Sequence, residues 1–203
     1  MHTITDIPVS LDTEALMRKL KIEAGSEDAA RFSDLVAHAE QIARPKTVYR
    51  EAFIEETDTD SVLVDGVSFR SRALSRNVAG AGRLFAFVVT CGREVHENAP
   101  DDGDFITEYW WDAIKERILR IACCRLFEHL EETFHLGRTA SMSPGSADAM
   151  VWPIEQQREL FHLIGGTERV YEATGVELTD SCLMVPNKSV SGVRFPTEIR
   201  FES

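Results

Sequence analysis

The chain has 203 residues, of which 43% are hydrophobic and 28% charged, a composition typical of one soluble globular domain. Its 34 Asp and Glu residues outnumber 22 Lys and Arg residues, and the net charge of -12 argues against nucleic-acid binding, which depends on phosphate neutralisation by basic side chains. No apolar run approaches the roughly 20 residues of a membrane span, and the N-terminus lacks the pattern of a secretion signal. We therefore expect a cytoplasmic protein.

Four cysteines are scattered along the chain, namely Cys91, Cys123, Cys124 and Cys182. None belongs to a CxxC pair, and the adjacent Cys123 and Cys124 would point about 100° apart on a helix. They cannot readily share a metal or form a bridge. The sequence therefore predicts free, buried thiols in a reducing compartment.

The first 45 residues are predicted to form a helical segment ahead of the main domain, which we place at 46–203. Helices are expected over 12–21 and 27–43, with Ser26 as the N-cap of the second. The second carries an apolar stripe at spacings of three and four: Phe32, Leu35, Val36, Ala39 and Ile42. Such a helix could dock a partner or a second copy, but packing on its own domain is the more frequent outcome.

The next segment changes to the alternation of β-strands. Asp65-Gly66 separates two short apolar runs within residues 47–69, which predicts a hairpin because both central positions favour positive φ. A short helix is expected over 71–78. The continuous apolar run 84–90 then predicts a central strand covered on both faces.

The second half contains the longest predicted helix, over 104–135, which follows an acidic segment at 94–112. The acidic residues suit a solvated helix N-terminus better than a cation site. Beyond a Ser/Pro/Gly loop, helices are expected over 153–164 and 167–174, and strands over 177–185 and 189–200. The elements do not alternate as βαβ units. We predict an α+β fold, with a twisted, largely antiparallel sheet packed against a long helix and several shorter helices.

Motifs for nucleophilic, metal or phosphate chemistry are absent from the sequence. Gly80-Ala81-Gly82 has two glycines of a dinucleotide fingerprint, but Phe85 stands at the third position and the run precedes a strand. His129 and His135 would lie on different faces of one helix. We assign no catalytic and no metal-binding residue.

The loop 141–148 is the strongest candidate for a ligand site. It offers small hydroxyls at Ser141, Ser143 and Ser146, and Gly145 has no Cβ to block a ligand. The alternative is a serine-rich turn that satisfies its polar groups locally. On the residue types alone, the local turn is favoured.

Several segments, in order along the chain, resemble one known family: the reactivation domain of cobalamin-dependent methionine synthase. They are 65–72, 84–92, Ser143-Pro144-Gly145, 152–157 and 178–192, so the resemblance spans about Val48 to Phe195. It implies a domain that binds S-adenosylmethionine and presents its methyl group to a reduced corrinoid. The implied ligand contacts are Ser141, Ser143, Gly145 and Ser146, with Lys188, Ser189 and Ser191 as weaker candidates.

The sequence also departs from that family at its charged positions. The family has an arginine where this chain has Ser141, a tyrosine where it has Ser146, and a ligand-facing glutamate near Cys124, with Glu128 one turn further. Charged hydrogen bonds contribute about 1.5–3 kcal/mol each, so their loss would weaken binding by orders of magnitude. Arg138 lies nearby in sequence and could substitute from another angle.

The resemblance leaves three functions open. The chain could be a stand-alone reactivation protein that binds S-adenosylmethionine and serves a corrinoid methyltransferase, with cobalamin held by a partner protein; whether it is itself an enzyme stays open. It could instead be a non-catalytic module that docks on a corrinoid protein with a degenerate ligand site. An unrelated small-molecule-binding α+β protein ranks last. Some stand-alone relatives continue into a cysteine-rich tail, whereas this sequence ends at Ser203, so we expect no metal role of that kind.

Overall fold

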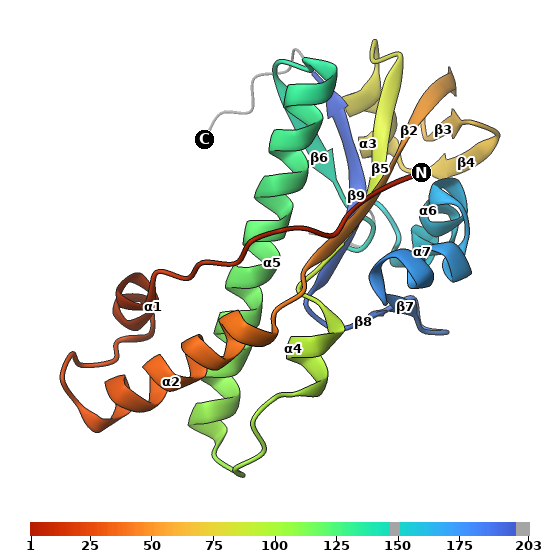
Figure 1. The fold of residues 1–203 in the computed structure, drawn as a ribbon. Helices are drawn as coiled ribbons and strands as arrows, with labels where there is room; N and C mark the ends of the chain where they lie inside the picture. Colours follow the sequence, from red (N-terminus) through yellow and green to blue (C-terminus); the bar gives the residue numbers. More distant parts are fainter. Residues whose placement is uncertain (147–150, 198–203) are drawn as a thin grey trace.

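The computed structural model describes residues 1–146 and 151–197. Its centre is a twisted antiparallel sheet, with one long helix crossing one face and shorter helices covering the other (Figure 1). The α+β prediction is confirmed. The helices are α1 (Thr13–Leu20), α2 (Glu27–Ile42), α3 (Arg72–Val78), α4 (Arg93–Glu97), α5 (Phe105–Phe134), α6 (Gln157–Ile164), α7 (Thr167–Thr174) and the 3-10 turn η1 (Ile154–Gln156).

The described strands are β1 (His2–Ile4), β2 (Lys46–Thr57), β3 (Ser61–Val64), β4 (Val67–Arg70), β5 (Arg83–Thr90), β6 (Thr139–Met142), β7 (Glu177–Leu178), β8 (Met184–Val185) and β9 (Ser189–Pro196). The main sheet runs β4-β3-β2-β5-β9-β6, and β1 also pairs with β2. β5 lies in the middle, as its apolar sequence predicted. β6 forms one edge, and β4 forms the other.

The predicted hairpin is present between β3 and β4. Val64 pairs with Val67 across the turn, and Asp65 and Gly66 have φ of 42° and 77°. Both central residues are thus left-handed, which matches the twist of an antiparallel strand pair.

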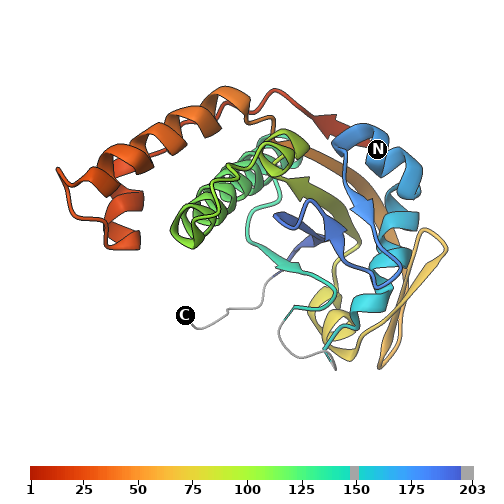
Figure 2. The ribbon, with the colours of Figure 1, turned by 90° about the horizontal axis from the view of Figure 1, so that it is seen from below.

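Two apolar layers flank the sheet. On one face, Phe85, Phe87 and Val89 of β5 pack against residues of α5 that include Leu126 and Leu130. On the opposite face, alternate β5 residues pack with α3, α6 and α7. Figure 2 shows α5 on one side of the sheet and α6 and α7 on the other. The alternation of the strand decides which helix each side chain meets.

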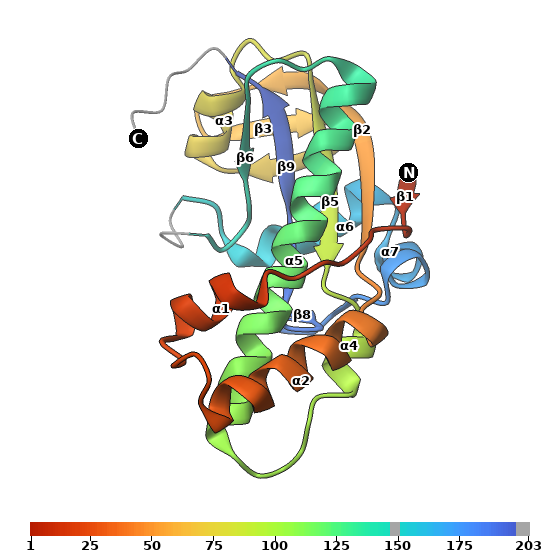
Figure 3. The same ribbon diagram turned by 60° about the vertical axis from the view of Figure 1, so that its left-hand side comes forward.

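The two N-terminal helices pack against the half of α5 that extends beyond the sheet (Figure 3). Phe32 and Val36 of α2 are buried in a cluster with Trp110, Ile114 and other residues of α5. The apolar stripe of α2 therefore packs against α5 of the same chain, as the prediction of packing on its own domain stated. Asp12 and Ser26 cap α1 and α2 through their side chains.

Three segments differ from the sequence prediction. Thr139–Met142 is strand β6, so Ser141 belongs to a sheet edge and not to a loop. Residues 177–185 form a small hairpin in place of one strand, because the polar turn after Leu178 bonds to itself, with Thr179 N donating to the Leu183 carbonyl at 2.8 Å. The acidic segment includes the short helix α4. Residues 147–148 of the predicted loop and 198–200 of the last predicted strand lie outside the described residues.

The prediction of buried thiols is correct for Cys91 and Cys182 and wrong for Cys124. Ala122 and Leu126 occupy the buried face of α5, so the 100° step per residue leaves Cys124 facing solvent. Cys123 is half-buried. Within the described ranges, no helix is long and apolar enough to cross a membrane.

Candidate functional site at the β6 edge

The predicted ligand loop begins at the free edge of the sheet. β6 pairs antiparallel with β9, with Ser141 opposite Arg194 and Met142 opposite Val193. Beyond Met142 the chain turns through a bend, which we define as residues 143–146. Ser141, Gly145 and Ser146 are exposed, Ser143 is half-buried and Pro144 is buried. The four predicted contacts therefore lie close together along one exposed stretch of chain.

The bend satisfies many of its own polar groups. The Ser146 hydroxyl donates to the Ser143 carbonyl at 2.7 Å, and the Ser146 backbone N–H donates to the same oxygen at 3.3 Å. Gly145 N–H donates to the carbonyl of the fully buried Trp152 at 2.8 Å. For Ser143 and Ser146, the structure thus contains the local turn that the residue types favoured.

Gly145 is required for a different reason from the one that the sequence suggested. Its φ is 73°, and a Cβ built there would lie 3.0 Å from the Ile154 side chain. The glycine therefore permits a left-handed turn packed on Ile154. Ile154 thus occupies the space that the missing Cβ leaves, whereas the sequence suggested that this space admits a ligand.

Sequence reasoning missed Arg194, which stands beside Ser141 on the neighbouring strand. Its guanidinium donates to the Ser141 hydroxyl at 3.1 Å, and its central carbon lies 3.9 Å from the centroid of the Phe127 ring on α5. Burial lowers the pKa of Arg194, and the carboxylate of Glu131 partly counters this. Alternation along β9 could have placed Arg194 on the α5 face, but its partnership with Ser141 depends on a pairing register that the sequence does not encode locally.

The three weaker candidates on β9 and the preceding turn do not join the bend. Lys188 forms an ion pair with Asp112 of α5 at 2.8 Å, and the Ser189 hydroxyl donates to Thr90 at 2.9 Å. Ser191 is 2% exposed and donates to Gln157 of α6, on the sheet face opposite α5. The side chains of these three residues therefore contact other parts of the chain, and the structure does not bring them to the bend.

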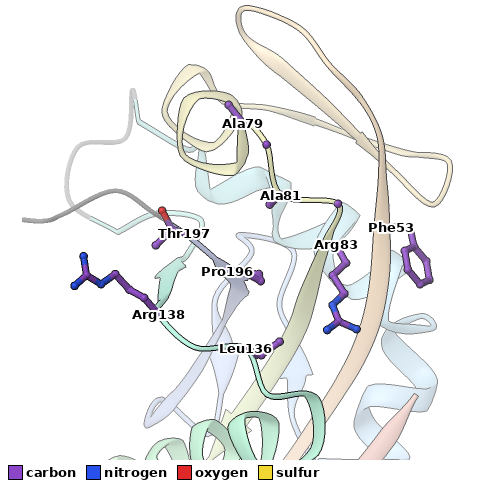
Figure 4. A pocket seen from close by; sticks show the side chains of 10 residues that line it. Phe53, Ala79, Ala81, Arg83, Leu136, Arg138, Pro196 and Thr197 are labelled. Carbon is purple, nitrogen blue, oxygen red and sulfur yellow. The ribbon is translucent and has the colours of Figure 1, made fainter.

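A hollow at one end of the sheet lies next to the end of the β6–β9 pair, because Pro196, the partner of Thr139 in β6, is among the residues that line it. This hollow, of about 1190 Å³, is lined among others by Phe53, the loop 79–83, Leu136 and Arg138 (Figure 4). A second hollow, of about 360 Å³, lies between α1 and α5. None of the seven predicted site residues lines either one. Arg138 lines the first hollow, and its role as a substitute charge for the bend stays a prediction.

The glutamate position predicted on α5 carries no acidic contact to the bend. Cys124 occupies it and is exposed, while Glu128 forms an exposed ion pair with Arg125 at 2.9 Å. Among the described residues, no group of three or more His, Cys, Asp or Glu side chains is placed to hold a metal ion. The chemistry that this edge offers is hydrogen bonding and charge recognition.

The chain is an α+β protein. It has an antiparallel sheet, a long helix across one face of that sheet, and a bend of small residues at the sheet edge. A search of solved structures matches this chain to the crystal structure of the MetH reactivation domain bound to AdoHcy, with a TM-score of 0.62 and 16% sequence identity. The match covers 100% of this chain and 81% of that one. It confirms, at the level of the fold, the resemblance predicted from the sequence. Searches of protein-family models and of curated proteins found no match.

Proposed function

We propose that this chain binds S-adenosylmethionine at the β6 edge and supports a corrinoid-dependent methyltransferase. The observation that carries the proposal is the fold, which over its whole length matches a domain whose structure was determined with AdoHcy. The order of the resembling segments along the sequence supports the same assignment. S-adenosylmethionine would supply the methyl group, and the acceptor would be cobalamin on a partner protein.

We expect the side chains at the β6 edge to contribute hydrogen bonding and stacking to such binding. Ser141 accepts one hydrogen bond from Arg194 and keeps its own O–H free to donate to a ligand. Phe127 and Arg194 supply an aromatic ring and a guanidinium on the α5 side of the same edge. The chain would hold and orient the ligand; proximity alone can supply a large part of a rate enhancement, so no proton-transfer residue is required.

Isothermal titration with AdoHcy tests this proposal. We expect saturable binding by the wild-type chain, because AdoHcy carries the nucleoside and amino-acid groups of the methyl donor. Ser141→Leu should weaken binding at least tenfold by replacing the edge hydroxyl with a bulky apolar group. Ser68→Leu is the matched control, since Ser68 is also an exposed serine but lies on β4 at the opposite edge of the sheet. Absent or millimolar binding by the wild type would contradict the proposal.

A second candidate function is that of a docking module. In this case the chain would bind a corrinoid protein but would no longer bind S-adenosylmethionine itself. The internal hydrogen bonds of Gly145 and Ser146 favour it, because they use groups that a ligand would otherwise engage. Binding of the chain to a purified corrinoid protein, undiminished when AdoHcy and S-adenosylmethionine are both absent, would support this alternative. A requirement for either ligand would exclude it.

A further inference from the structure

Arg194 has an unusual environment for an arginine with a structural role. It is half-buried, its guanidinium lies over the Phe127 ring at 3.9 Å, and its recorded hydrogen bond goes to the neutral Ser141 hydroxyl. A guanidinium has five N–H donors in a fixed planar fork. The two contacts fix the plane of this fork and leave most of its donors for another acceptor.

No carboxylate among the described residues lies within ion-pair distance of Arg194. Three other half-buried arginines do have such partners: Arg50 contacts Asp65 at 3.1 Å, Arg83 contacts Glu51 at 2.7 Å and Arg93 contacts Glu177 at 2.9 Å. Glu131 is close enough to influence the charge of Arg194, but its side chain accepts from the Gly137 backbone N–H. Partial burial of a charge without a direct ion pair is costly, so this position favours an incoming anion.

We propose that Arg194 is the carboxylate-binding residue of the β6 edge and selects nucleosides that carry an amino-acid group. This inference rests on the proposed function, since it assigns the recognition of one part of that ligand. The guanidinium matches a carboxylate through two parallel hydrogen bonds. Stacking on Phe127 holds the fork in place before binding, which reduces the entropy lost when a ligand is captured.

Arg194 also gives this edge a positive charge, which the resembling family has at the position of Ser141. Ser141 occupies the position where the resembling family has an arginine, and Arg194 is its direct cross-strand partner. The edge therefore carries a positive charge on the strand next to position 141. The hydroxyl of Ser141 accepts a hydrogen bond from this guanidinium and helps to hold it in place.

Two ligands separate the roles of the nucleoside and the carboxylate. AdoHcy contains both, whereas 5′-methylthioadenosine keeps the nucleoside and the thioether but has no amino-acid group. Titration of Arg194→Met should show binding of AdoHcy weakened by about 10- to 100-fold, with 5′-methylthioadenosine changed by less than threefold. Methionine keeps an apolar side chain over Phe127, so packing is largely retained. Arg194→Lys should bind AdoHcy with intermediate affinity, because it keeps the charge and loses the fork.

Arg70→Met is the matched control, since Arg70 is also an arginine of the sheet but is exposed on β4 at the opposite edge. It should leave both affinities unchanged. Equal losses for the two ligands in Arg194→Met would show that Arg194 acts only through the fold, and unchanged AdoHcy binding would show that it does not touch the carboxylate. Either result overturns this inference alone. A wild-type chain that binds neither ligand overturns the proposed function as well.

Discussion

At the residue scale, the β6 edge depends on positions where a side chain would not fit. Gly192 of β9 is the clearest: a Cβ there would lie 2.4 Å from the Met142 carbonyl oxygen and 2.6 Å from the Ser143 hydroxyl. The bend therefore packs directly on the backbone of β9. A residue without a side chain in mid-strand normally weakens a sheet, and here it permits this close approach.

Gly192→Ala should destabilise the protein by about 1–3 kcal/mol, because the added methyl group overlaps backbone atoms that cannot move independently. Gly82→Ala is the control, since a Cβ at Gly82 meets nothing within 4 Å; it should change stability by less than about 0.5 kcal/mol. Urea unfolding followed by circular dichroism measures both. Equal stability of the two variants would show that the bend does not pack on β9.

The cysteines differ in reactivity according to burial. Burial raises the pKa of Cys91 to about 12 and, with the adjacent Cys124, the pKa of Cys123 to about 11. At about pH 8 these thiols carry almost no thiolate, the reactive form. We expect one fast-reacting thiol in the native protein with a thiol-specific disulfide reagent, and Cys124→Ser should remove it. A fast phase that persists in this variant would contradict the placement of Cys124 on the exposed face.

At the element scale, α5 organises the molecule. Its first half packs with α2 and α4, and its second half covers the sheet beside β5 and β9. An ionic contact joins α5 to the start of β9: Asp112 of α5 pairs with Lys188, just before β9, at 2.8 Å, and also with Lys115 of its own helix at 3.5 Å. This contact helps to set where β9 begins relative to α5, and β9 in turn carries Arg194.

The contribution of Asp112 to stability should depend on pH. Desolvation raises its pKa, but the hydrogen bond from Lys188 and the charges of Lys188 and Lys115 outweigh it, so its pKa is lower than the reference value of 3.8. A lowered pKa in the folded state stabilises the protein above the unfolded pKa, and this contribution disappears as the pH falls through the folded pKa.

We therefore expect Asp112→Asn to lower the melting temperature at about pH 7, and its difference from wild type to shrink below about pH 4. Asp101→Asn serves as the control, because Asp101 is exposed and precedes the same helix; it should have little effect at either pH. A difference between Asp112→Asn and wild type that stays constant with pH would exclude an ionic role for Asp112.

Elements with strong local signals could be predicted from the sequence, and those that depend on long-range pairing could not. The Asp65-Gly66 turn, the apolar run of β5 and the periodicity of α5 each carry their own signal. β6 is four residues long and has no apolar alternation, so it exists only because β9 pairs with it. Ser141 could be predicted because it belongs to a recognisable serine-rich segment. Arg194 could not, because its place beside Ser141 depends on the pairing of β6 with β9.

At the scale of the whole molecule, the fold matches that of a known domain although the two sequences are mostly different. The chain shares its fold with the AdoHcy-bound MetH reactivation domain across its full length at 16% identity. Its β6 edge combines a small-residue bend, partly closed by its own hydrogen bonds, with one half-buried guanidinium. Whether a nucleoside binds there depends on the balance between these two features.

The most direct test is to map AdoHcy onto the folded chain by NMR, following backbone amides and the Arg194 side-chain N–H signals during titration. We predict saturable shifts that concentrate at Ser141, the bend and Arg194, with little change at the loop 79–82, on the far side of the first hollow from Arg138. Shifts confined to that hollow, or no shifts at millimolar AdoHcy, would contradict a ligand site at the β6 edge.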